Sequence, residues 1–143
     1  MRVRNAMTRQ VERTWPDATL QQAAQQMREA SIGFLPVEEE GRLVGVVTDR
    51  DITVRGTARG LDPRTARVRE AMTPQVVACR EDQAVADAST LMEERAVRRL
   101  VVLDAGERLV GVLSLDDLAV LPGGELQAGA VLDSLAAPRE PRD

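Results

Sequence analysis

The chain has 143 residues, with 19 basic and 23 acidic side chains, a formal net charge of −4 and no histidine. Because 43% of the residues are hydrophobic and only 1% aromatic, a domain of this length must build an aliphatic core. The lack of histidine excludes histidine-dependent catalytic triads and histidine-ligated zinc. The only cysteine, Cys79, excludes a metal site made of thiolates.

The acidic balance and the scarcity of stacking aromatic side chains predict that nucleic acid is not a partner. Residues 1–10 carry basic side chains but no apolar run typical of a signal peptide, and no stretch reaches the roughly 18 apolar residues of a membrane span. We therefore expect a cytoplasmic protein that does not bind membranes, with Cys79 reduced and in the core.

The sequence consists of two copies of one unit. The Ala-Met-Thr of residues 6–8 recurs at residues 71–73, and the same offset of 65 relates Asp17 to Asp82 and Met27 to Met92. The offset grows by one residue just after the turn glycine, where insertions are tolerated. We expect repeats at residues 1–62 and 63–122, followed by a tail at 123–143 that is partly disordered.

In the first copy the periodicity predicts strand, helix, strand, strand and helix, at residues 11–14, 19–30, 34–37, 43–47 and from 49 onward. Thr19 and Gln22 have the spacing of a capping box at the start of the first helix. Two glycines and a proline in residues 55–64 indicate a connector between the copies.

The second copy repeats this order at residues 76–79, 85–92, 100–103, 109–113 and from 115 onward. Here Asp82 is the expected helix cap, because Gln83 replaces the threonine of the first copy. In the tail, Leu126, Val131, Leu132 and Leu135 suggest a short amphipathic helix, and residues 138–143 are expected to be disordered. The predicted fold class is mixed α/β, with two β-α-β-β-α repeats.

Each copy has a hydroxyl residue at the end of a strand and a carboxylate three positions later: Thr48 with Asp51, and Ser114 with Asp117. Such a helix start can receive a phosphate, to which the hydroxyl adds a donor. The aspartate can accept two hydrogen bonds from a cis-diol such as a ribose. Ordinary helix capping explains the same residues, and a duplicated fold can simply retain its cap.

These motifs together resemble the cystathionine-β-synthase (CBS) domain family, and specifically a tandem pair called a Bateman module. The resemblance spans about residues 3–121 and rests on the Val-x-x-x-Met-Thr openings at Val3 and Val68, the Asp-x-Thr-Leu turn at Asp17, the Leu-Pro-Val strand at Leu35 and both Gly-x-x-Thr/Ser-x-x-Asp motifs. It implies repeats packed about a pseudo-twofold axis, two clefts that often hold adenosine-containing ligands, and modules that pair as homodimers.

The resemblance also implies which residues bind. In each cleft the hydroxyl would contact phosphate, the aspartate would contact ribose, and adenine would pack on the first strand and a turn of the opposite repeat. One cleft would comprise Thr48, Asp51, Val76, Val77, Arg98 and Arg99. The other would comprise Ser114, Asp117, Val11 and Phe34. We expect the Thr48 cleft to bind more tightly because of its arginines, unless Arg98 and Arg99 only cover apolar surface with their stems.

The sequence therefore predicts a non-catalytic regulatory module that binds AMP, ADP, ATP or S-adenosylmethionine and signals to a separate effector protein. No obligatory cofactor and no protein metal site are expected, and Mg²⁺ would enter only with a polyphosphate. The alternative is a structural dimerisation module with vestigial clefts. An enzyme is disfavoured because the chain has no paired nucleophile and no Walker-type phosphate loop.

Overall fold

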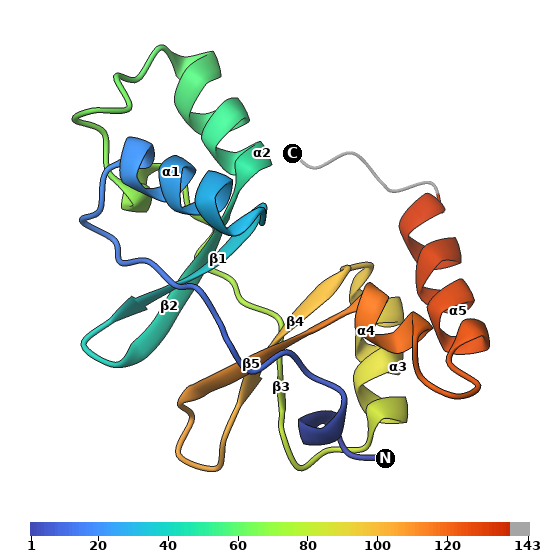
Figure 1. Cartoon of the computed structure of the whole chain (residues 1–143). Helices are drawn as coiled ribbons and strands as arrows, with labels where there is room; N and C mark the ends of the chain where they lie inside the picture. The colour runs from blue at the N-terminus through green and yellow to red at the C-terminus, as the bar shows by residue number, and fades with distance from the viewer. Residues whose placement is uncertain (138–143) are drawn as a thin grey trace. The chain divides into compact units, whose positions relative to one another are not determined.

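Figure 1 shows the computed structural model, which describes residues 1–137. The chain forms two compact units, and each combines parts of both sequence repeats. The Thr48 unit is Glu12–Val76. The Ser114 unit is Met1–Val11 together with the chain from Val77 onward. The predicted boundaries at residues 62 and 122 describe the sequence repeats and stay a prediction, and the disorder predicted for residues 138–143 lies outside the described residues.

The Thr48 unit is built on an antiparallel hairpin whose central pairs join Leu35 to Val47 and Pro36 to Val46. Helix α1 lies beside this hairpin, and the chain continues from β2 directly into helical turns (Figure 1). The elements are α1 (Leu20–Ala30), β1 (Phe34–Glu39), β2 (Arg42–Thr48), α2 (Asp49–Asp51), the π turn η2 (Ile52–Gly56), and the 3-10 turns η3 (Thr57–Arg59) and η4 (Val68–Glu70).

One feature of this unit matches the sequence and two do not. Thr19 and Gln22 form the predicted capping box. The strand predicted at residues 11–14 is wrong, because only Thr14 pairs, in a parallel bridge to Val37; Pro16, two residues later, has no N–H to extend the pairing. The predicted connector begins too early, since the helical turns run on through Arg59 to Gly60, which adopts φ 73°.

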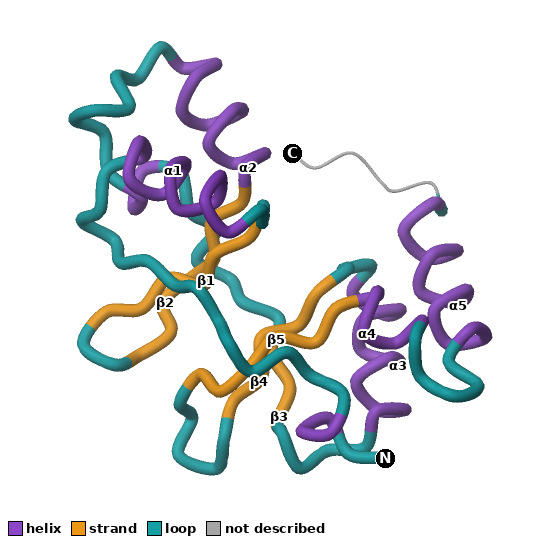
Figure 2. Tube along the Cα trace, in the orientation of Figure 1, coloured by secondary structure: helices purple, strands orange, loops and turns teal. Residues whose placement is uncertain are grey.

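The Ser114 unit has a three-stranded sheet in the order β3-β4-β5, with β3 parallel and β5 antiparallel to β4. Its helices gather on one side of the long strands (Figure 2). The elements are η1 (Val3–Asn5), β3 (Ala78–Arg80), α3 (Val85–Arg95), β4 (Arg99–Leu103), β5 (Leu109–Ser114), α4 (Leu115–Ala119) and α5 (Glu125–Ala136). The opening segment joins this unit through Val3 N, which donates to Gln83 O at 2.9 Å.

The predicted cap of α3 is wrong. Ala84 is the N-cap residue and makes no side-chain hydrogen bond, and the Gln83 side chain accepts from Arg80 N instead. The tail helix is confirmed as α5, and its Val131 is fully buried against the core. Leu126 is 87% exposed, so the apolar stripe of this helix is only partly buried. Among the described residues, no helix is long and apolar enough to cross a membrane.

The core is aliphatic, as the composition predicts, and it includes Cys79, which is 4% exposed. Met7 packs in the core of the Ser114 unit, and Met72 packs against that of the Thr48 unit. Two glycines permit the close approach of the Met-Thr segments, Met7-Thr8 and Met72-Thr73, to strands β5 and β2. A Cβ at Gly45 would lie 2.7 Å from Thr73 O, and a Cβ at Gly111 would lie 2.9 Å from Thr8 O.

Cys79 gives a prediction about pH. Burial raises the pKa of its thiol from 9.0 to about 11, because the thiolate loses hydration. The native state therefore holds the thiol proton more tightly than the unfolded state. Its contribution to stability is complete below pH 9 and is lost as the pH rises through 11. We expect a thiol reagent to modify the unfolded protein rapidly at pH 8 and the native protein at least tenfold more slowly. Equal rates would contradict the burial of Cys79.

Candidate functional site

The Thr48 motif lies where β2 ends and α2 begins. The Asp51 backbone N–H donates to Thr48 Oγ1 at 3.0 Å, and the Thr48 N–H donates to Asp51 Oδ2 at 3.0 Å. Both residues are half-buried. This reciprocal pair is a capping box, so capping explains the three-residue spacing of hydroxyl and carboxylate.

The Ser114 motif has the same geometry. The Asp117 N–H donates to Ser114 Oγ at 3.2 Å, and the Ser114 N–H donates to Asp117 Oδ2 at 2.8 Å. The cap therefore recurs in both units. Since it occurs twice with matching atoms, the duplicated sequence pattern encodes one local structure.

Capping leaves chemistry available at both motifs. In each box the hydroxyl oxygen acts as an acceptor, so its own O–H remains a donor, and the cap uses one oxygen of the carboxylate. Among the described residues, no hydrogen bond reaches Oδ1 of Asp51. A donor hydroxyl and a carboxylate oxygen held in fixed positions can bind an anionic oxygen and a sugar hydroxyl, respectively.

A threonine from each Met-Thr segment lies beside its motif. Thr8 exchanges backbone hydrogen bonds with Val112 on β5 at 2.9 and 3.0 Å, and Thr73 does the same with Val46 on β2 at 2.8 and 2.9 Å. The Thr8 hydroxyl also donates to Oδ1 of Asp117, at a long 3.4 Å. Thus the second oxygen of Asp117 has a partner that Asp51 lacks among the described residues.

Arg55, which the sequence does not single out, contacts the segment that pairs with β2. Its Nη1 donates to Met72 O at 3.0 Å, to Thr73 Oγ1 at 3.3 Å and to Ala71 O at 3.4 Å. The sequence shows only that it follows Asp51 by four residues, and the structure places it in the π turn η2. The sequence instead predicts that Arg55 begins the connector at residues 55–64.

The predicted site residues are divided between the two units. Val76 belongs to the unit of Thr48 and Asp51, and Val11 to the unit of Ser114 and Asp117. The remaining assigned residues are in the other unit from their motif: Val77, Arg98 and Arg99 for the Thr48 cleft, and Phe34 for the Ser114 cleft.

Backbone contacts place each of these four residues within its own unit. The Val77 carbonyl accepts from Val101 N at 3.2 Å. Phe34 pairs with Thr48 across the β1–β2 hairpin, and Arg99 pairs with Ser114 across β4–β5. The Arg98 carbonyl accepts from Leu115 N at 2.9 Å, and the side chains of Arg98 and Arg99 are exposed. Their assignment to clefts completed by the opposite repeat stays a prediction.

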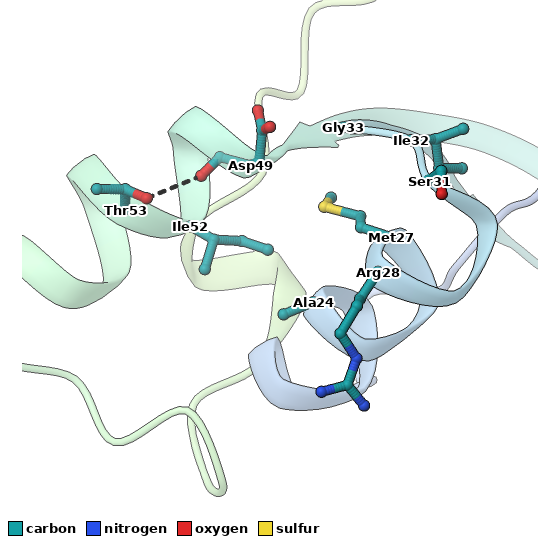
Figure 3. A pocket seen from close by; sticks show the side chains of 9 residues that line it. All are labelled: Ala24, Met27, Arg28, Ser31, Ile32, Gly33, Asp49, Ile52 and Thr53. Carbon is teal, nitrogen blue, oxygen red and sulfur yellow. Dashed lines mark hydrogen bonds between the residues drawn. The ribbon is translucent and has the colours of Figure 1, made fainter.

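A pocket of about 520 Å³ lies elsewhere in the Thr48 unit, between the end of α1 and the helical turns that follow β2. Figure 3 shows Met27 pointing into it, with Asp49, Ile52 and Thr53 on the facing side. Asp51 and Arg55 do not line it. Residues two apart on a helix point to different faces, so Asp49 faces this pocket and Asp51 does not share it. The pocket was not predicted and is separate from the motif.

No set of three or more His, Cys, Asp or Glu side chains in residues 1–137 is placed to hold a metal ion.

Comparison with known proteins gives the family. The model of the CBS domain matches the chain twice, at residues 3–55 and 68–122. The CBS domain-containing protein YhcV of Bacillus subtilis is 40% identical over 134 residues, which cover 94% of each chain.

Two solved structures share the fold. The crystal structure of Hypoxic Response Protein I with two coordinated zinc ions has 38% identity and a TM-score of 0.77, covering 85% of this chain and 100% of that one. The CBS domain protein PAE2072 of Pyrobaculum aerophilum, complexed with AMP, has 25% identity and a TM-score of 0.74, covering 90% of this chain and 98% of that one. With both repeats matched and the fold shared, this chain belongs to the CBS domain family and is a tandem CBS domain pair.

Proposed function

We propose that this protein is a non-catalytic regulatory module that binds an adenosyl ligand at the Thr48/Asp51 and Ser114/Asp117 motifs. The observation that carries the proposal is the pair of capping boxes, each of which fixes a hydroxyl and a carboxylate while leaving the hydroxyl proton free to donate. The AMP held by the related PAE2072 supports an adenosine ligand.

The proposed chemistry follows from these groups. The carboxylate of Asp51 or Asp117 accepts hydrogen bonds from the two ribose hydroxyls, and the hydroxyl of Thr48 or Ser114 donates to a phosphate or carboxylate oxygen of the ligand. Val76, Val77, Arg98 and Arg99 would complete the first site, and Val11 and Phe34 the second. Mg²⁺ would accompany a polyphosphate only.

We further propose that the module acts as a homodimer on a separate effector protein. A ligand shifts the balance between two conformations only if it binds one of them better. The regulatory output would therefore be a ligand-dependent change in conformation or pairing, and not turnover. Hydrolysis of a nucleotide by the wild type that is lost in Asp51→Asn would contradict the non-catalytic assignment.

Thermal unfolding tests the proposal directly. A ligand at about 100 times its Kd stabilises the native state by about 2.7 kcal/mol, which corresponds to a rise in Tm of about 5–10 °C for a chain of this size. We expect such a rise with at least one of AMP, ADP, ATP with Mg²⁺, and S-adenosylmethionine. Ribose 5-phosphate serves as the control without a base and should give a smaller shift.

A structural dimerisation module is the second candidate, because capping explains the motif hydroxyls and carboxylates without any ligand. An unchanged Tm with all four compounds at millimolar concentration would favour it.

A further inference from the structure

The two repeats differ four residues after the motif aspartate, where one has a charged side chain and the other an apolar one. Gly45, Thr48 and Asp51 correspond to residues 66 positions later in the second repeat, so Arg55 corresponds to Leu121. Leu121 packs against the aliphatic core of the Ser114 unit. Four residues after the motif aspartate, the Thr48 unit therefore has a guanidinium on the segment that pairs with β2, where the Ser114 unit has a hydrocarbon side chain.

Arg55 is half-buried and is held by neutral acceptors. All three of its hydrogen bonds use Nη1, and they go to two backbone carbonyls and the hydroxyl of Thr73. Within residues 1–137, no carboxylate lies within 4.0 Å of its nitrogens. A partly buried cation without a counter-ion favours the arrival of an anion, and two of its nitrogens, Nε and Nη2, have no partner among the described residues.

The nearest acid in sequence does not neutralise this charge. Asp51 lies four residues before Arg55, and the chain passes from α2 into the π turn η2 between them. Its Oδ2 instead accepts from the Thr48 N–H in the capping box. Since the two side chains do not pair with each other, the carboxylate remains available for a diol and the guanidinium for an anion.

The threonine of the Met-Thr segment strengthens the contrast. In the Ser114 unit the Thr8 hydroxyl donates to Asp117, so it partly satisfies the carboxylate. In the Thr48 unit the Thr73 hydroxyl accepts from Arg55 instead. The arginine thus both adds a positive charge and engages the threonine that would otherwise resemble Thr8.

We propose that Arg55 selects a phosphorylated adenosyl ligand at the Thr48/Asp51 site, whereas the Ser114/Asp117 site, with Leu121 at the corresponding position, prefers phosphorylated over unphosphorylated ligands less strongly. This inference rests on the proposed function. It assigns phosphate selection to a residue of the Thr48 unit itself, independently of Arg98 and Arg99. The guanidinium binds the phosphate through Nε and Nη2 while Nη1 keeps its contacts to the Met-Thr segment.

The test is titration calorimetry with AMP and with adenosine, in the Asp117→Asn background so that one motif is measured. Charge-assisted hydrogen bonds of this kind correspond to about 10- to 100-fold in affinity. We expect Arg55→Leu to weaken AMP binding by this factor and to change adenosine binding by less than about threefold. Arg55→Lys, which keeps the charge, should recover part of the preference for AMP.

Arg59→Leu is the matched control, because it removes the same charge from an exposed position one turn later. It should leave the affinity ratio of AMP to adenosine unchanged. Equal losses of AMP and adenosine in Arg55→Leu would overturn the inference, since they would show that Arg55 only fixes the Met-Thr segment. Unchanged AMP binding would also overturn it. Absence of binding by either compound to the parent protein would instead refute the proposed function.

Discussion

Replacing Asp51 by asparagine is expected to weaken adenosyl ligand binding by about 10- to 100-fold, the scale of hydrogen bonds to a charged group. Asparagine can still accept from the Thr48 N–H through its carbonyl oxygen, so the cap survives. The negative charge is lost, and the second carboxylate oxygen is replaced by an amide NH2 group, which donates and cannot accept from a ribose hydroxyl. We therefore expect the free energy of unfolding to change by less than about 1 kcal/mol, while calorimetry with AMP shows the loss in affinity.

Two variants make this prediction specific. Asp51→Ala removes the cap as well, so it should lower both the affinity and, by about 0.5–2 kcal/mol, the stability. Asp49→Asn removes a charge from the same turn, but Asp49 lines the separate pocket and its Oδ1 accepts from Arg50 N. Its AMP affinity should stay within about threefold of wild type. If Asp51→Asn bound AMP as wild type does, the carboxylate would be a cap and nothing more.

The ranking of the two sites follows from the same measurement. The expectation that the Thr48 site is the tighter one requires the tighter binding to disappear in Asp51→Asn. Its loss in Asp117→Asn would reverse the order of the sites.

Substituting Gly45 by alanine is expected to destabilise the protein by about 1–3 kcal/mol, as overpacking of a close contact does. The new Cβ would lie 2.7 Å from Thr73 O and 3.3 Å from Met72 Sδ. The first of these is a backbone atom whose residue pairs with Val46 in both directions, so the strand contact must open to make room. Urea unfolding should show a lower midpoint.

Gly129→Ala is the control for this change. Gly129 lies within α5, and a Cβ there would meet nothing within 4 Å. Alanine in a helix interior is about 0.5–1 kcal/mol more favourable than glycine, so this variant should be slightly more stable than wild type. An unfolding midpoint for Gly45→Ala equal to that of Gly129→Ala would show that the Met-Thr segment shifts without cost, which would contradict its close packing against β2.

Much of the fold was predictable because it is local. The capping box at Thr19, the hairpin around residues 34–48 and the buried apolar stripe of α3 each depend on residues a few positions apart. The motif was also predictable, since hydroxyl and carboxylate three residues apart cap a helix wherever they occur. Its duplication, read from the sequence, appears in the structure as two matching boxes.

The errors came from features that depend on distant contacts. Residues 11–14 were expected to form a strand, yet only Thr14 has a pairing partner. Asp82 has the ideal chemistry for a cap, but the helix begins two residues too far along for its side chain to be used. Arg55 looked like part of a linker because glycines follow it. Its contacts to residues 71–73 exist only after the chain has folded back on itself.

The most direct test of ligand recognition by the two motifs is a crystal structure determined from crystals grown with AMP. We expect density for the nucleotide at the Thr48 motif, with both ribose hydroxyls within hydrogen-bond distance of the Asp51 carboxylate and the phosphate against Thr48 and Arg55. Density for AMP away from both motifs, or none at a concentration that saturates binding in solution, would contradict the assignment of Asp51 and Asp117 to ligand recognition.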